Sequence, residues 1–197
     1  MIEKTIFTLQ LIQIDFFTAF GLVTILYFLI SIFSKNQYLK NIDEESNRFI
    51  SFIGIVFLLV WIIGIFTELN LLTEEDKGFL IDRMFGKYWI GFWIQPLLWV
   101  IVTQLLRLNS VRKNVLLRII FAVLLIFSIE KMVIIYTSFQ RDYLPSSWVM
   151  YNDLSIYPSN LILELLMKIV VFLLSVGIFF LINRKINERK TAKLKSL

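Results

Sequence analysis

"FISFIGIVFLLVWIIGIFT", residues 49–67, contains no charged side chain. A helix of roughly 20 apolar residues crosses the ~30 Å hydrocarbon core of a bilayer. Two further windows, 16–34 and 88–106, are also free of charge, and 116–137 and 161–183 are as long but contain charged residues. The sequence therefore predicts an all-α, polytopic membrane protein with five transmembrane helices.

The composition agrees with a membrane protein. Of the 197 residues, 58% are hydrophobic, whereas a soluble domain has about 45–50% apolar residues. The amino terminus lacks the basic region and the small-residue cleavage site of a signal peptide. Since no segment resembles a soluble catalytic domain, we expect residues 1–197 to form a single membrane domain.

Two residue types that carry much of redox and metal chemistry are missing. The sequence contains no cysteine and no histidine, which excludes disulfides, thiolate-bound clusters, bis-histidine haem and most zinc sites. We therefore expect no cofactor bound by this chain through such ligands. Proton-linked work would fall to Asp, Glu, Lys, Tyr or water.

The distribution of basic residues predicts the orientation. Lysine and arginine collect in the connections 35–48 and 107–118 and in the tail 184–195. These three segments share one side of a five-span chain, and basic loops favour the cytoplasm. The sequence therefore predicts that the amino terminus lies outside and the carboxyl terminus lies in the cytoplasm. The net charge of +5 is explained by this orientation and by contact with lipid, and we expect no nucleic-acid partner.

The segment 73–85, "TEEDKGFLIDRMF", has the pattern of a short helix. Thr73 is a suitable N-cap, and the three acidic residues after it favour the positive end of a helix dipole. The apolar residues that follow suit a helix lying in the membrane interface.

Several uncharged windows contain polar side chains. On 49–67 and just beyond it, Gly54, Trp61 and Glu68 recur every seven residues, as expected of one helical stripe. On 88–106, Gln95 shares a face with a tryptophan and a threonine, and Gln104 lies beside that face. Small and polar residues of this kind either join neighbouring helices or line a functional site, and the sequence leaves both readings open.

Charged residues within the remaining predicted spans cost more free energy on membrane insertion than the uncharged polar residues. A carboxylate at the centre of a spanning helix costs about 2.5–3.5 kcal/mol on insertion scales, which makes Glu130 a candidate functional residue. Its neighbour Lys131 points about 100° away around the helix. Alternatively, Glu130 braces the 138–151 loop by pairing with Arg141. Glu164 and Lys168 have the spacing of an intrahelical ion pair, which is either purely structural or functional.

The stretch "IEKMVIIYTSFQRDYLPSSWVMY", residues 129–151, resembles a signature of the NrfD/PsrC family, the polytopic membrane subunits of polysulfide-reductase-type complexes. It is most similar to the quinol-oxidising membrane subunits of bacterial alternative complex III. The matching positions are Glu130, Lys131 (in place of arginine), Ser138, Arg141, Asp142, Leu144, Pro145, Ser146, Trp148 and Tyr151. Upstream, "GKYWIGFWIQPLLWVIVTQLL" (86–106) is similar to another family helix, with Thr103 in place of a proline, and Glu68 stands where a family helix ends in an acid.

The resemblance implies a fold and a role. Family members have eight to ten spans in two four-helix bundles, so this chain resembles the second half: an NrfD-like four-helix bundle plus one extra helix. The implied function is that of a membrane subunit in a quinone-linked respiratory electron-transfer complex, not of an enzyme by itself. The implied location is the bacterial cytoplasmic (inner) membrane. Its implied partners are other membrane subunits and an extracytoplasmic redox subunit, with a quinone such as menaquinone at an interface. The family's quinone pocket is generally placed in the first bundle, which this chain lacks.

The resemblance also implies roles for individual residues. By this resemblance, Glu68, Gln104 and Glu130 are candidates for a proton path or for the neighbourhood of a quinone. Gln95 joins these candidates because of the polar face of the window 88–106. The candidates for contact with the loop or with a partner are Lys131, Arg141, Asp142, Trp148 and Tyr151. Two other functions stay open, namely half of a dimeric transporter or channel, and a structural or assembly protein that has the fold without the chemistry.

Overall fold

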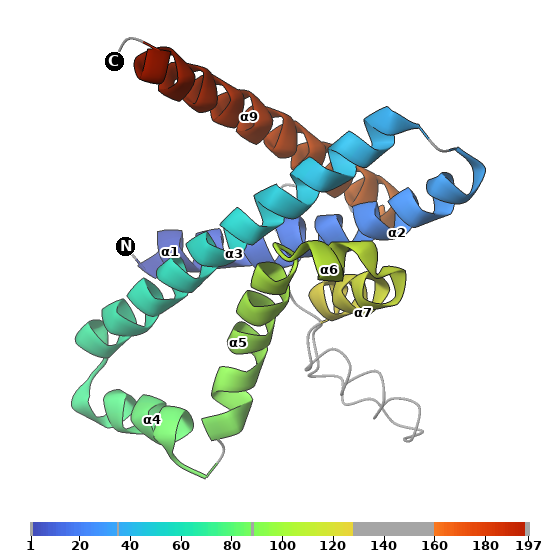
Figure 1. Ribbon diagram of the computed structural model, residues 1–197. Coiled ribbons are helices and arrows are strands. Elements are labelled where there is room, and N and C mark those ends of the chain that lie inside the picture. Colours follow the sequence, from blue (N-terminus) through green and yellow to red (C-terminus); the bar gives the residue numbers. More distant parts are fainter. Residues whose placement is uncertain (1, 35, 88, 128–159, 196–197) are drawn as a thin grey trace, which may run out of the picture.

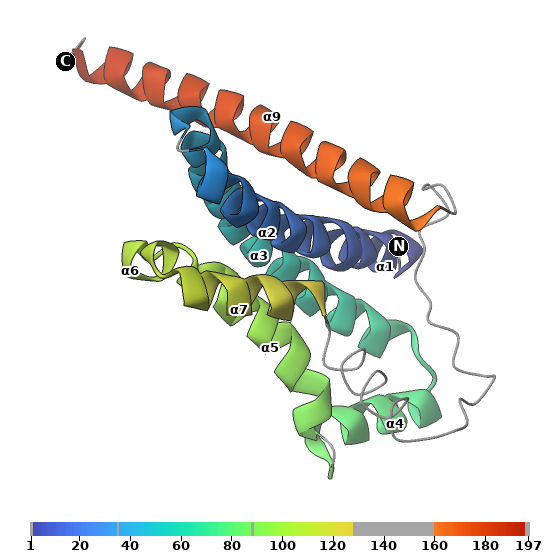
Figure 2. The same ribbon diagram turned by 90° about the vertical axis from the view of Figure 1, so that its right-hand side faces the viewer.

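The described chain consists of helices of very unequal length, and the figures show how they cross (Figures 1 and 2). The computed structural model describes residues 2–34, 36–87, 89–127 and 160–195. These residues contain no β-strand. The helices are α1 (Ile2–Gln10), the π-helix η1 (Leu11–Phe17), α2 (Thr18–Phe33), α3 (Gln37–Leu71), α4 (Glu74–Phe85), α5 (Trp89–Leu105), α6 (Asn109–Lys113), α7 (Val115–Ile126) and α9 (Leu161–Lys195).

Several helices are long and apolar enough to cross a membrane. In the described part of the chain these are Thr5–Phe33, Gln37–Leu71 and Ile162–Arg189, and a fourth is added if the bent pair α4 and α5 forms one span. The two helices of that pair differ in direction by 69°. The expected all-helical fold is confirmed for the described residues, and its long apolar helices are compatible with a membrane protein.

The number of five spans stays a prediction. The predicted window 88–106 is occupied by α5, which has 17 residues. The window 116–137 is occupied up to Ile126 by α7, with 12 residues, and most of its second half lies outside the described residues. The first helical segment of membrane-spanning length, Thr5–Phe33, begins well before the predicted start at Phe16. The charge-free window 16–34 therefore underestimated its length.

The helices pack in layers, as Figure 2 shows most clearly. α9 lies along the α1–α2 side and contacts α2 and α3, while α5, α6 and α7 lie on the opposite side. α2 also contacts α7, and α3 contacts α5. Helices that follow each other along the chain are also in contact, namely α2 with α3 and α5 with α7.

Aromatic side chains fill the space where these helices cross. Phe17 lies 5.5 Å from Phe57 and 5.7 Å from Trp99 between ring centroids, which joins η1, α3 and α5. Phe172 of α9 lies 5.6 Å from Phe49 of α3. Edge-to-face arrangements of this kind add about 0.5–1.5 kcal/mol per pair to the area that they bury. The core thus combines these aromatic rings with aliphatic side chains such as Ile50 and Leu106.

Local sequence explains where several helices begin. The backbone N–H of Tyr38 donates to Asn36 Oδ1 at 2.9 Å, so Asn36 caps α3. At α4 the N–H of Asp76 donates to Thr73 Oγ1 at 3.3 Å, as predicted from the sequence. Such caps satisfy backbone donors that have no partner in the first turn.

One face of the short helix α4 packs against α5. Trp93 Nε1 donates to the carbonyl of Met84 at 2.8 Å. Leu80 and Met84 are buried, whereas Phe79 and Phe85 are 65% and 71% exposed. The predicted helix over 73–85 is confirmed, and its exposed aromatic rings fit the predicted position at the membrane interface.

Candidate functional site

Three ionisable side chains meet between the first helical segment and α9. Lys168 Nζ forms an ion pair with Glu164 Oε1 one turn earlier on α9, and lies 3.8 Å from Asp15 Oδ1 of η1. Asp15 is 1% exposed and Lys168 is 5% exposed. We name these residues the buried ionic triad. The Glu164–Lys168 pair has the geometry that its spacing predicts, and the structure adds a second carboxylate to it.

Asp15 reaches this position on an unusual piece of backbone. Residues 11–17 form a π-helix inside an otherwise continuous helical segment. π-helical turns are rare and frequently occur at functional sites. An isolated carboxylate among apolar helices is costly, and the ammonium group of Lys168 reduces that cost by compensating its charge. Asp15 was not a candidate from the sequence, because the charge-free window was taken to begin at Phe16.

Aromatic rings close the triad on one side. Phe172 lies one turn after Lys168 on α9 and is fully buried. Its ring centroid lies 6.4 Å from that of Phe16 and 6.2 Å from that of Phe20. These apolar rings follow Asp15 and Lys168 along their helices, and apolar surroundings strengthen electrostatic interactions between charged groups.

A second buried ion pair joins α3 to α7. Arg118 Nη1 donates to Asp43 Oδ2 at 2.9 Å, and Nη2 donates to the other carboxylate oxygen. The guanidinium carbon lies 4.7 Å from the ring centroid of Phe28 and 5.5 Å from that of Tyr27. A bidentate pair stacked on rings is a rigid arrangement. Sequence reasoning counted both charged residues only as orientation signals and missed their pairing.

The polar stripe on α3 is a close contact with α5. Ser51 Oγ donates to the carbonyl of Thr103 at 2.9 Å, and Gln104 Nε2 donates to the carbonyl of Ser51 at 2.9 Å. A Cβ atom at Gly54 would lie 2.0 Å from Thr103 Oγ1. These contacts support the packing interpretation of the glycine stripe, because a small residue lets the two backbones approach.

The predicted polar candidates are not brought together. Glu68 is exposed near the end of α3, whereas Gln104 is bonded to Ser51, roughly 25 Å away along α3 at 1.5 Å per residue. Gln95 is half-buried on α5, more than two turns from Gln104. The described residues therefore contain no continuous Glu68–Gln95–Gln104 arrangement.

The remaining predicted residues lie outside the described part of the chain. These are Glu130, Lys131, Arg141, Asp142, Trp148 and Tyr151. Their roles stay predictions. Within the described ranges, no group of three or more acidic side chains is placed to hold a metal ion.

Comparisons with protein-family models, with curated proteins and with solved structures give no match to this chain. Its function must therefore be inferred from its own residues, and the buried ionic triad is the group in the described structure whose position is hardest to explain by packing alone.

Proposed function

We propose that the chain is an integral-membrane subunit of a quinone-linked respiratory electron-transfer complex similar to alternative complex III. The resemblance at residues 129–151 supports this family of assemblies. Electron transfer would belong to cofactors held by partner subunits, because this chain has no histidine or cysteine to ligate them. Its own part is to dock an extracytoplasmic redox subunit and to supply ionisable groups within the membrane.

The observation that carries the proposal is the buried ionic triad. Ionisable residues within membrane helices are rare and mark proton or substrate pathways. Here two carboxylates, Asp15 and Glu164, share the ammonium group of Lys168. A carboxylate that shares its counter-ion takes up a proton without leaving the lysine unpaired. In this proposal the triad accepts and releases a proton in step with quinol oxidation.

The proposed orientation places the triad in the outer half of the membrane. Glu164 is in the first turn of α9, and the predicted topology starts this helix on the outer side. Quinol oxidation releases protons, so an acceptor near the outer surface has a direct use. Quinone itself is proposed at an interface with a partner, since the NrfD/PsrC family generally has its pocket in the first bundle, whereas this chain resembles the second.

One observation favours a second candidate, an assembly protein without chemistry. The Asp43–Arg118 pair and the Ser51–Thr103–Gln104 contacts bind helices to each other and direct their polar atoms at protein groups. A chain used only as a scaffold needs such contacts and no proton acceptor. The two candidates differ in what happens when the triad is neutralised.

The first test is purification of the tagged full-length chain from its native membrane in a mild detergent. The proposal predicts co-purification with membrane subunits and with a partner that shows haem or iron–sulfur absorption. A colourless homo-oligomer would contradict it and would favour the dimeric transporter or channel.

The second test is proton translocation driven by quinol in membranes that contain the assembled complex. Asp15→Asn and Glu164→Gln should each lower the rate by about tenfold or more, in the range of lost acid–base groups. Glu44→Gln, an acid at the opposite end of the bundle, serves as the matched control and should leave the rate unchanged. If both triad variants translocate protons at the wild-type rate while the complex stays intact, the proton-acceptor role is wrong. The chain is then better described as an assembly protein without chemistry.

A further inference from the structure

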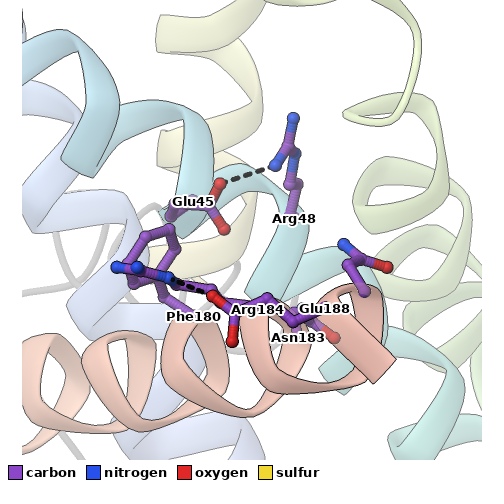
Figure 3. Close-up of a pocket in the computed structure, with 7 residues that line it drawn as sticks. Glu45, Arg48, Phe180, Asn183, Arg184 and Glu188 are labelled. Carbon is purple, nitrogen blue, oxygen red and sulfur yellow. Dashed lines mark hydrogen bonds and ion pairs between the residues drawn. The ribbon is translucent and has the colours of Figure 1, made fainter. Parts of the chain in front are cut away.

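A cavity of about 380 Å³ lies between the first part of α3 and the second half of α9 (Figure 3). Its volume falls within the roughly 300–1,000 Å³ typical of sites for small ligands. It is lined by Glu45, Arg48, Phe180, Asn183, Arg184, Asn187 and Glu188. Neither the ionic triad nor the α3–α5 contact extends into it, so it needs its own explanation.

The position of the cavity along both helices is that of the membrane surface. Glu45 and Arg48 come directly before the charge-free window 49–67 of α3. On α9 the lining residues 180–188 span the end of the apolar segment 161–183. Both helices therefore leave the hydrocarbon at the cavity, which places it at the depth of lipid headgroups.

The cavity is open, and aromatic rings join α3 and α9 on its hydrocarbon side. The ring centroid of Phe179 lies 5.5 Å from that of Phe49 and 5.5 Å from that of Phe52. These contacts hold α3 and α9 together directly below the charged residues. Phe180, which lines the cavity itself, presents an apolar ring where the acyl chains of a lipid would continue into the bilayer.

The charges that line the cavity are balanced. Arg48 Nη1 donates to Glu45 Oε1 at 2.6 Å, and Arg184 Nε donates to Glu188 Oε1 at 2.8 Å (Figure 3). Each guanidinium group has N–H donors beyond the one that forms its ion pair. The cavity thus offers two sets of donors suited to a phosphate, and two carboxylates suited to an ammonium group.

We propose that this cavity binds the headgroup of a phospholipid that carries a primary ammonium group, of the phosphatidylethanolamine type. Arg48 and Arg184 bind the phosphate, and Glu45 and Glu188 accept hydrogen bonds from the ammonium group. Two positive and two negative side chains match a zwitterionic headgroup better than a purely anionic one. The bound lipid fixes α9 against α3 at the cytoplasmic surface. This inference depends on the placement of the helices in a membrane and not on the electron-transfer role.

The test is native mass spectrometry of the full-length chain in detergent, titrated with phosphatidylethanolamine, phosphatidylcholine and phosphatidylglycerol, and separately with inorganic phosphate. Phosphatidylethanolamine should bind most tightly, because the quaternary ammonium of phosphatidylcholine has no N–H to donate. In the double variant Arg48→Gln/Arg184→Gln, the affinity for phosphatidylethanolamine should fall by about tenfold or more. A loss of this size is expected when charge-assisted hydrogen bonds are removed.

The matched control is Lys185→Gln/Arg189→Gln, which removes two positive charges from exposed positions of the same helix end outside the cavity. It should bind phosphatidylethanolamine as the wild type does. Equal weakening in both double variants would overturn the proposal, because general attraction to a basic surface would then explain binding. Competition by inorganic phosphate would also overturn it, since the site would then take a free anion.

A third variant covers the case in which the arginine double variant does not fold. Glu45→Gln/Glu188→Gln retains the phosphate donors and should abolish the preference for phosphatidylethanolamine over phosphatidylcholine. If that preference persists in a variant that elutes and melts as the wild type does, the carboxylates do not contact the ammonium group and the proposal is wrong.

Discussion

Arg118 and Asp43 form a buried, bidentate ion pair although they are 75 positions apart in the sequence, with Arg118 Nη1 2.9 Å from Asp43 Oδ2. The pair connects the beginnings of α3 and α7. Both residues belong to connections that the charge pattern assigns to one side of the membrane. Their contact agrees with that assignment and shows that two charges near a membrane surface also hold the bundle together.

Breaking this pair should destabilise the protein strongly. Asp43→Asn and Arg118→Met each leave one buried group without its charged partner, a loss of about 3–5 kcal/mol for buried pairs. The double variant Asp43→Leu/Arg118→Met should recover much of that loss, because no unpaired charge is left. Thermal unfolding in detergent measures all three variants.

The control for the buried pair is the exposed pair Lys77–Glu74 on α4, in which Glu74 is 91% exposed at its side chain. Glu74→Gln should change the free energy of unfolding by no more than about 1 kcal/mol. If Asp43→Asn and Glu74→Gln lowered the free energy of unfolding equally, burial would not determine how much these ion pairs contribute to stability.

Lys168 should be the least replaceable member of the triad for stability. Lys168→Met removes the positive charge that Asp15 and Glu164 share and leaves two carboxylates between apolar helices. Asp15→Asn leaves the Lys168–Glu164 pair intact and should cost less. The unfolding temperature of Lys168→Met should therefore be the lowest of the single variants. A triple variant, Asp15→Asn/Glu164→Gln/Lys168→Met, should recover part of the loss, and a further decrease would contradict this account.

Local patterns predicted the features that depend on neighbouring residues. Thr73 followed by three acids gave the start of α4, and the spacing of Glu164 and Lys168 gave their ion pair. Hydropathy gave the long helices because the bilayer sets their length. The cap and the ion pair are decided within one or two helical turns, and the long helices by the apolar character of a continuous run of residues.

Some features that the sequence did not reveal depend on contacts between residues far apart in the chain. Another was missed because the predicted span 16–34 was chosen to contain no charged residue. Asp15 stands next to a charge-free run, so a window chosen to exclude charges also excluded the residue that pairs with Lys168. Nothing in "LIQIDFF" (11–17), which has no glycine or proline, distinguishes a π-helix from an α-helix. Arg118 and Asp43 carry no sequence signal that links them. Such pairings become visible only when the helices are packed.

Gly54 should tolerate no side chain. A Cβ atom there would lie 2.0 Å from Thr103 Oγ1 and 2.7 Å from Thr103 Cβ, so Gly54→Ala forces α3 and α5 apart. Overpacking of this kind costs about 1–3 kcal/mol. Gly177 of α9 is the matched control, because a Cβ atom there meets no atom within 4 Å. Gly177→Ala should leave thermal stability equal or slightly higher, since alanine favours the helix by about 1 kcal/mol. Similar effects at the two glycines would refute close packing of α3 on α5.

Single cysteines should report the orientation directly, because the natural chain contains none. Glu75 of α4 and Lys113 of α6 are both exposed, and the predicted topology places them on opposite sides of the membrane. A maleimide reagent that cannot cross the membrane should label Glu75→Cys in intact spheroplasts, and it should label Lys113→Cys only after lysis. The physical reason is the excess of lysine and arginine around residue 113, which favours the cytoplasm. The reverse labelling pattern would show that the orientation is the opposite of the predicted one. The buried ionic triad would then lie in the cytoplasmic half of the membrane, and it could not receive protons released at the outer surface.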